Sequence, residues 1–407
     1  MKKIILILVS FIFLYGCSEP IKEMPKEVTI NYKNEDIEVY KELKIKDLII
    51  DSNVEISNKN ENIITSEIGK QNINVYYTYK NRKYVDVYKL KVVDTTSPRI
   101  ISGTNKTIYV GDEINFCDKV FYGDNYDRKV KCEIFGEYDL NVPGKYELEM
   151  TLTDDSLNII KKKVILNVIE KPISTTDKKE EKKDTNKVDG ILFNDIFNKY
   201  KNDNTLIGID VSRWQKDIDF QKVKEAGCEF VIIRMGIQSD YDKNISIDVN
   251  FEKNYENASK NDLKVGVYVY NSLNRTKDVK KQVNYIIRNL KNKKLDFPIA
   301  FDWENWSSWN KYNMNFNDIN EIANKYIKLL EKKGYKGMLY SSKFYLENIW
   351  ITSLENPVWL AHYTEETDYL GDYFLWQLTD KGLIDGINGN VDVNVLYKDK
   401  YEEIMKK

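Results

Sequence analysis

The sequence predicts a multidomain protein in which two small all-β sandwiches precede an α/β barrel of a modified TIM type. The chain has 407 residues, which is too long for one ordinary domain. Residues 25–172 show short alternating strands separated by Gly, Asn and Asp turns, with weak helical periodicity. From residue 203, strand-like runs alternate with amphipathic segments, which is typical of a parallel sheet covered by helices.

The first residues have the pattern of a bacterial lipoprotein signal. Two lysines precede an apolar run over 4–13, which is too short to span a bilayer comfortably. The next four residues, Leu-Tyr-Gly-Cys17, resemble a lipobox, although a small residue is more usual than the tyrosine. We therefore expect a signal peptide over 1–17, a lipidated Cys17 and a location on the outer face of the cytoplasmic membrane. An uncleaved or ordinarily cleaved signal is the alternative.

The β-rich part contains an internal repeat. Strand–turn–strand units begin at Gly69 and Gly144, about 75 residues apart. This offset predicts immunoglobulin-like modules over 18–96 and 97–170. The second module resembles the immunoglobulin-like modules of bacterial surface proteins through residues 94–98, 110–112, 122–125 and 142–146. We expect both modules to act as spacers or weak binders.

Cysteines and charges limit the possible functions. Cys117 and Cys132 lie 15 residues apart and are either a disulfide or two reduced buried thiols. Residues 171–190 are charged, mixed in sign and free of aromatic side chains, so we expect a flexible linker over 171–202.

Composition argues against several classes of protein. The net charge of −2 and the mixing of positive and negative residues do not indicate a basic surface for binding nucleic acid. The single histidine, His362, disfavours zinc-dependent amidases and peptidases, which need further His or Cys ligands. No Gly-rich phosphate loop is present, so we expect neither a metal nor a cofactor. The sequence makes no prediction of the oligomeric state.

The elements of the last domain, 203–407, follow from periodicity. Strands are predicted over 206–211, 230–235, 265–270, 298–303, 358–363 and 373–378, and helices over 220–226, 248–261, 276–290 and 317–333. Residues 276–290 show the helical face most clearly, with apolar side chains at Val279, Val283, Ile286, Ile287 and Leu290. After Tyr340 the strands come closer together, which is compatible with antiparallel pairing at the end of the barrel.

The most informative segment is Asp302-Trp303-Glu304, which ends the apolar run 298–301. Side chains at i and i+2 of a strand share a face, which places the two carboxyl groups roughly 7 Å apart at the backbone. Paired carboxylates on a rigid face suit acid/base cleavage of a glycosidic bond. The alternative is a solvated strand edge or a pair of partners for nearby lysines.

Acidic residues also recur in two other segments that we place at strand ends. Asp210 lies in Gly208–Gln215 beside Trp214, and Asp392 lies in Gly389–Asn394. Because the functional residues of a βα barrel lie at the carboxyl ends of its strands, we expect these acids to meet Asp302 and Glu304.

Residues 205–397 resemble glycoside hydrolase family 25, the Chalaropsis-type lysozymes. The resemblance rests on residues 208–212, 214–215, 230–234, 248, 251, 254, 258, 266–270, 302–304, 359–363, 376–377 and 391–394. It implies a flattened barrel that cleaves the β-1,4 bond between N-acetylmuramic acid and N-acetylglucosamine in peptidoglycan. It further implies a membrane-tethered extracellular muramidase whose partners are peptidoglycan strands and, through the lipid, the membrane.

The resemblance also implies roles for individual residues. Glu304 would be the general acid, with a pKa raised by neighbouring carboxylates. Asp302 would stabilise the developing positive charge, either by orienting the substrate's N-acetyl group or by direct attack. Asp210 and Asp392 would complete an acidic floor. Arg234 would pair with a catalytic carboxylate, bind substrate or form a structural salt bridge. The candidates for sugar stacking, of which we expect at least half to be core, are Trp214, Tyr268, Tyr270, Tyr340, Trp359 and Trp376.

Two alternatives remain open at the level of sequence. One is a non-catalytic peptidoglycan-binding scaffold on a degenerate barrel, and the other is a hydrolase of a different wall polymer.

Overall fold

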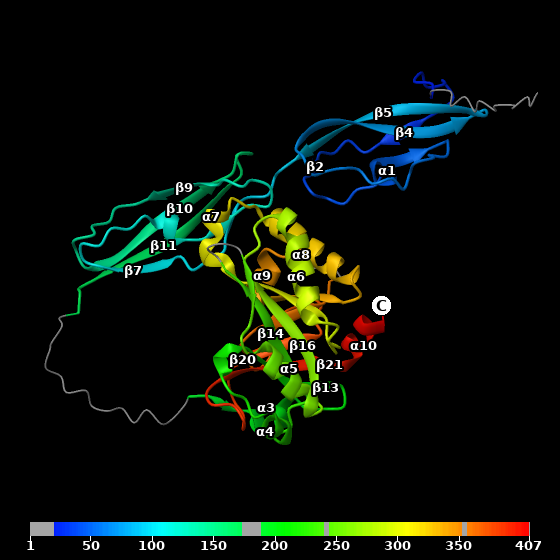
Figure 1. The fold of residues 1–407 in the computed structure, drawn as a ribbon. Coiled ribbons are helices and arrows are strands. Elements are labelled where there is room, and N and C mark those ends of the chain that lie inside the picture. The colour runs from blue at the N-terminus through cyan, green and yellow to red at the C-terminus, as the bar shows by residue number, and fades with distance from the viewer. Residues whose placement is uncertain (1–19, 173–188, 240–243, 352–355, 407) are drawn as a thin grey trace, which may run out of the picture. The chain divides into compact units, whose positions relative to one another are not determined.

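The computed structural model describes residues 20–172, 189–239, 244–351 and 356–406 (Figure 1). It divides into two compact units, residues 1–95 and 96–407. The predicted signal peptide and Cys17 lie outside the described residues, as do residues 173–188, which are half of the predicted linker. Residues 191–200, also within the predicted linker, form a strand and a helix. Within the described ranges, no helix has the length and apolar character needed to cross a membrane.

The first module consists mainly of strands, as predicted. Strands β1 (Ile30–Tyr32) and β3 (Ile49–Ser52) form one antiparallel pair, with α1 (Ile45–Leu48) beside them. A second sheet has the order β2 (Ile37–Glu38), β5 (Arg82–Val93) and β4 (Gly69–Tyr79). The β4–β5 hairpin turns at Lys80 and Asn81, both with positive φ, which matches the right-handed twist of its strands. A sandwich arrangement of these sheets stays a prediction.

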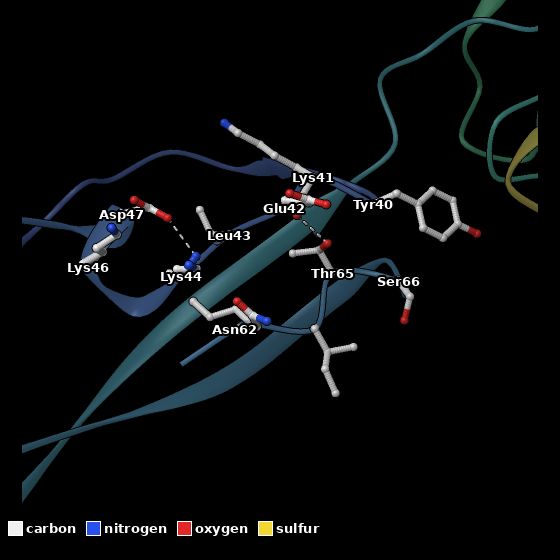
Figure 2. Close-up of a pocket in the computed structure, with 12 residues that line it drawn as sticks. Tyr40, Lys41, Glu42, Leu43, Lys44, Lys46, Asp47, Asn62, Thr65 and Ser66 are labelled. Carbon is white, nitrogen blue, oxygen red and sulfur yellow. Dashed lines mark hydrogen bonds between the residues drawn. The ribbon is translucent and has the colours of Figure 1, made fainter. Parts of the chain in front are cut away.

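A hollow of about 700 Å³ lies on the surface of the first module (Figure 2). Its walls are the loops 40–47 and 62–66. The Thr65 hydroxyl donates to the Lys41 carbonyl over 2.8 Å, and Asp47 accepts from the Lys44 amide over 2.8 Å. Its carboxylates are Glu42 and Asp47, and three lysines share its walls. The hollow therefore offers no cluster of acids.

The second module contains a four-stranded sheet with the order β7 (Asn105–Tyr109), β11 (Ile159–Ile169), β10 (Gly144–Thr153) and β9 (Lys131–Phe135). A short pair, β6 (Arg99–Ile100) and β8 (Tyr122–Gly123), accompanies it. The predicted strand–turn–strand repeat is present as the β4–β5 and β10–β11 hairpins.

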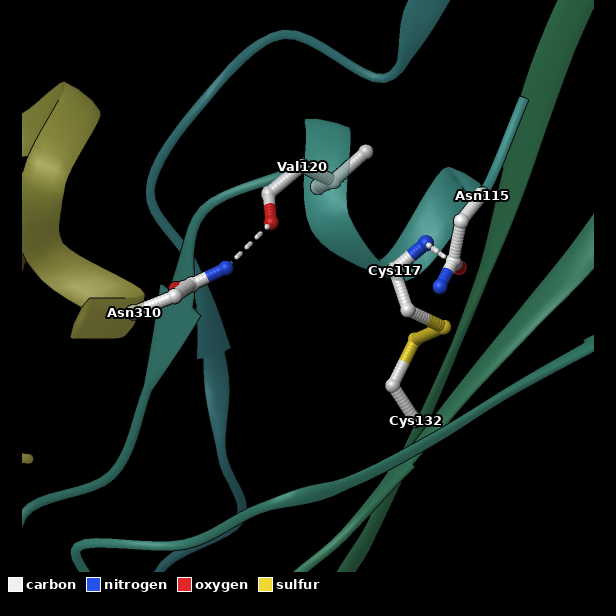
Figure 3. Close-up of a disulfide and its surroundings, with 5 residues drawn as sticks. All are labelled: Asn115, Cys117, Val120, Cys132 and Asn310. Atoms are coloured by element: carbon white, nitrogen blue, oxygen red, sulfur yellow. Dashed lines mark hydrogen bonds between the residues drawn. A yellow bond between two sulfur atoms is a disulfide. The ribbon is translucent and has the colours of Figure 1, made fainter. Parts of the chain in front are cut away.

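Cys117 and Cys132, which the sequence left undecided, form a disulfide with an S–S distance of 2.01 Å (Figure 3). The disulfide joins α2 (Phe116–Lys119) to β9.

In the described part of the last domain, eight strands form a closed barrel. Their order is β13 (Thr205–Val211), β14 (Phe230–Gln238), β16 (Lys264–Asn271), β17 (Ile299–Trp303), β18 (Gly337–Ser342), β19 (Val358–Ala361), β20 (Leu375–Leu383) and β21 (Val391–Tyr397). Consecutive neighbours are parallel from β13 to β20, and β21 is antiparallel to both β13 and β20. The predicted barrel is confirmed, and its antiparallel end is confined to the last strand. Short strands β12 (Ile191–Leu192) and β15 (Ile245–Ile247) pair with β20 and β14.

Helices surround the barrel (Figure 1). They are α3 (Phe193–Tyr200), α4 (Phe220–Glu225), α5 (Phe251–Lys260), α6 (Thr276–Leu290), α7 (Trp309–Tyr312), α8 (Phe316–Glu331), α9 (Lys343–Asn348) and α10 (Lys398–Lys406). Helix α6 has the predicted bounds, and four of its five predicted apolar positions are buried while Ile287 is partly buried. The predicted helices over 220–226, 248–261 and 317–333 correspond to α4, α5 and α8.

The barrel interior is filled by apolar side chains, among them Phe230, Ala300, Met338 and Leu375. Gly208 on β13 makes room for one of them. A Cβ at Gly208 would lie 2.4 Å from the Phe230 carbonyl oxygen and 2.5 Å from its ring. The packed interior closes the barrel beneath the polar side chains at the strand ends.

Candidate active site

The ends of three strands bring the four predicted acids into one cavity of about 300 Å³. Asp210 comes from β13, Asp302 from β17 and Glu304 from the first turn after β17. Asp392 reaches the same place because β21 runs antiparallel to β13, with Asp392 paired in register with Asp210. Parallel strands end at the same face of a barrel, which explains the convergence of the others.

Most of the other predicted residues line the same cavity. They are Trp214, Arg234, Tyr268, Tyr270, Tyr340 and Trp359. The cavity also contains Tyr363 and Gln377, which the sequence analysis did not select. Trp376 does not line it. Side chains alternate along β20, so Gln377 faces the cavity while Trp376 packs in the outer layer and donates to the His362 carbonyl over 2.9 Å.

The aromatic residues of the cavity differ in exposure. Trp214 is 70% exposed, so much of its ring is open to a sugar, although the Arg213 guanidinium lies over the ring at 5.0 Å. Trp359 is buried and donates from Nε1 to Asn394 Oδ1 over 2.8 Å. Tyr363 is 53% exposed. Trp214 and Tyr363 are therefore the rings best placed for stacking.

Two amide side chains hold Asp210. Its Oδ2 accepts from Gln377 Nε2 over 2.9 Å and from Asn394 Nδ2 over 2.8 Å. Gln377 Oε1 in turn accepts from the hydroxyls of Tyr340 and Tyr363 over 2.9 and 3.1 Å. Burial raises the pKa of Asp210 to about 6, while the two amide donors oppose that rise. The two amide donors thus offset part of the cost of burying the carboxylate form of Asp210.

Asp302 has a different environment. It is buried, and within the described chain its Oδ1 has no hydrogen-bond partner. Burial raises its pKa well above the usual range, the charges of Glu304 and Asp210 add to the rise, and Arg234 opposes it. A buried acceptor without a partner at the floor of a cavity is suited to a ligand donor.

Glu304 and Asp392 also hold their protons more tightly than usual. Glu304 lies open to the cleft, yet desolvation by the surrounding protein raises its pKa and the Asp210 charge adds to the rise. An interaction with the Tyr340 hydroxyl opposes both. Burial, followed by the charges of Asp210, Asp380 and Glu304, raises the pKa of Asp392 to about 9. Neighbouring acids contribute as predicted, but desolvation is the larger cause.

Arg234 is paired with an aspartate outside the acidic cluster. Its Nη2 lies 2.7 Å from Asp248 Oδ2, and both side chains are buried. Asp248 also accepts from the backbone amides of Arg213 and Asn250 over 3.2 and 3.0 Å. The pair is therefore structural and secures the loop that carries Trp214, while the charge of Arg234 still reaches Asp302.

The cleft continues on the other side of Glu304. A second hollow of about 430 Å³ shares Glu304, Tyr340 and Tyr363 with the first and adds Lys343, Phe344 and His362. His362 Nδ1 lies 2.9 Å from Thr367 Oγ1. Glu304 thus lies at the junction of two hollows, as a group acting on a bond within a chain would require.

A closed α/β barrel with carboxyl groups gathered at its strand ends suits a glycoside hydrolase. The family described as Glycosyl hydrolases family 25 matches residues 209–387. An uncharacterized protein of Escherichia coli K12, YegX, is 31% identical over 196 residues, or 47% of this chain and 69% of that protein. The chain therefore belongs to glycosyl hydrolases family 25.

Further similarities have a comparable extent. The autolytic lysozyme of Clostridium acetobutylicum is 27% identical over 189 residues, or 46% of this chain and 54% of that protein. A solved family 25 glycosyl hydrolase from Bacillus anthracis is 23% identical, covers 50% of this chain and 93% of its own, and superimposes with a TM-score of 0.42.

Proposed function

We propose that this protein is a membrane-tethered extracellular muramidase that hydrolyses the β-1,4 bond between N-acetylmuramic acid and N-acetylglucosamine in peptidoglycan. The observation that carries the proposal is the group of four carboxyls with raised pKa values, one of which opens into a cleft with two halves. Membership of family 25 and the similarity to an autolytic lysozyme support the choice of substrate.

Glu304 is the general acid. Its raised pKa favours the protonated carboxyl, and its position between the two hollows places that proton at a bond spanning them. When the C–O bond breaks, Glu304 transfers its proton to the leaving oxygen. A water molecule then adds to the sugar carbon and returns a proton to Glu304.

Asp302, in its ionised form, supports the positive charge that forms on the sugar. The partnerless Oδ1 is positioned to accept a hydrogen bond from the N–H of the substrate's N-acetyl group or to face the sugar carbon directly. Asp210, held by Gln377 and Asn394, adds a fixed negative charge that favours the cationic transition state. Asp392 completes the floor as a largely protonated group near neutral pH.

The tether through Cys17 is part of the proposal. The Cys117–Cys132 disulfide supports the extracytoplasmic location that such a tether would give, because disulfides persist in oxidising compartments.

The test is hydrolysis of purified peptidoglycan by the chain from residue 18, followed by borohydride reduction and analysis of the sugars. Reduced muramic acid is the expected product, and Glu304→Gln should not form it. Reduced glucosamine would contradict the bond assignment. Sedimentation with the wall in the absence of new reducing ends would favour the scaffold alternative, and activity on another wall polymer alone would favour a different hydrolase.

A further inference from the structure

The second module packs against the segment that directly follows Glu304. Strand β8 of the module contacts α7 of the barrel domain. Gly123 on β8 lies close to the barrel domain, because a Cβ there would lie 2.7 Å from Phe316 Cε1 and 2.8 Å from Trp309 Nε1. Ile101 of the module belongs to the same buried apolar cluster as the outer layer of the barrel. The two parts therefore share a core although 171–202 was predicted to separate them.

Polar contacts extend this packing along the same segment. The Phe316 amide donates to the Asp124 carbonyl over 2.7 Å, and Asn310 Nδ2 donates to the Val120 carbonyl over 3.2 Å (Figure 3). These bonds use backbone carbonyls of the module, so they depend on its position and not on its side chains.

Two further contacts fix the start of α8. Asn315, which caps α8, donates from its amide to the Tyr126 carbonyl. Arg128 forms a two-pronged pair with Asp318, with both N···O distances 2.8 Å. Asp318 also accepts from the Asn315 backbone amide, so the pair reinforces the cap of α8.

A chain of aromatic rings connects this contact to the catalytic strand. Trp303, which lies between Asp302 and Glu304, is fully buried, and its ring centroid is 4.6 Å from that of Trp306. Trp306 lies 5.8 Å from Trp309, and Trp309 lies 5.4 Å from Phe316. The last two rings are those that Gly123 contacts. Packed rings transmit displacement because protein interiors have little free volume.

We propose that the second module is a fixed part of the catalytic unit, which positions Asp302 and Glu304 through β8, α7 and the chain of indole rings. Its residues at the contact are positioning residues, since none of them lines the cleft. The module thus does more than space the barrel from the membrane. The effect on turnover rests on the proposed muramidase activity, whereas the effect on local order does not.

The test compares two valine substitutions in the full chain. Gly123→Val places a side chain against Phe316 and Trp309, whereas Gly103→Val in the same module meets nothing within 4 Å. Neither glycine has a positive φ, so the backbone accepts both changes. The readouts are hydrogen exchange over residues 299–318 and the steady-state kinetics on solubilised peptidoglycan.

Gly123→Val should increase hydrogen exchange over residues 299–318 and leave β13 and β14 protected. It should also lower kcat by about tenfold with KM nearly unchanged, because small displacements of catalytic groups reduce turnover steeply. Gly103→Val should match the unchanged protein. Equal kcat or equal exchange for the two variants would overturn the proposal.

A second variant decides the case in which Gly123→Val unfolds the module. Asn310→Ala removes one hydrogen bond from the barrel side and leaves the module intact. Asn310→Ala should give a smaller increase in exchange and a smaller loss of kcat than Gly123→Val. Unchanged exchange together with an unchanged kcat would contradict the proposal. If the unchanged protein does not cleave peptidoglycan, the proposed function fails, while the exchange comparison still tests the docking.

Discussion

Replacing Asp392 by asparagine should stabilise the protein near neutral pH while impairing its site. The folded-state pKa of Asp392 is about 9, against an ordinary value of about 3.9 for aspartate. At pH 7 the folded protein therefore retains a proton that the unfolded chain releases. A span of about three pH units at 1.36 kcal/mol each sets an upper limit of about 4 kcal/mol for this cost.

The expected gain is smaller than that limit. Asp392 is partly exposed and its pKa depends on the charges of neighbouring acids, so we expect Asp392→Asn to raise the free energy of unfolding at pH 7 by about 1–3 kcal/mol. Because the folded-state pKa is the higher one, the cost is absent below about pH 4 and grows as the pH rises toward 9. The stability gained by Asp392→Asn should likewise be absent below about pH 4 and grow as the pH rises toward 9.

Chemical denaturation at a series of pH values measures this directly. Asp385→Asn is the matched control, since Asp385 is an exposed acid in the loop before β21 and surface changes usually alter stability by less than about 0.5 kcal/mol. A stability difference between Asp392→Asn and the unchanged protein that is the same at pH 4 and pH 8 would refute the reasoning.

Three further predictions concern the cleft and the barrel. Glu304→Gln should lower kcat by at least about 100-fold and leave cosedimentation with peptidoglycan unchanged, because only the proton is lost; substantial residual turnover would exclude Glu304 as the acid. Asn394→Leu removes one hydrogen-bond donor from Asp210, and a hydrogen bond to a charged group is worth about 1.5–3 kcal/mol. The acidic limb of the pH profile of kcat/KM should therefore move to higher pH by about one unit or more. An unchanged acidic limb would exclude Asp210 as the group that titrates there. Gly208→Ala should lower the free energy of unfolding by about 1–3 kcal/mol because its Cβ meets Phe230, and a neutral result in thermal melts would show that the barrel relaxes around it.

Much of the barrel could be predicted from periodicity. Helix α6 was found with its bounds because its apolar residues recur every three to four positions with no interruption. Strand β18 was not among the predicted strands, because its six residues include Gly337 and two serines and carry little β signal. Tyr340, which the resemblance suggested as a site residue, lies on it.

The four acids could be predicted because strand ends share one face of a barrel. Gln377 was not selected, since an amide that holds a carboxylate has no catalytic signature of its own. Trp376 was proposed for the site as one of the aromatic residues suggested by the resemblance, although alternation along β20 allows only one of two neighbours to face the cavity. The contact at Gly123 could not be predicted, because it depends on two surfaces brought together by the fold.

The closure of the barrel by β21 determines when the site can exist during synthesis. Strand β13 begins at Thr205 and its partner β21 begins at Val391. The pairing of β13 with β21 can therefore form only after the ribosome has synthesised most of the domain. Until then β13 and β20 each have an open edge, and Asp210 lacks Asn394 and its register partner Asp392. A nascent chain that still lacks β21 is therefore expected to be inactive, which delays any cleavage until the last strand is in place.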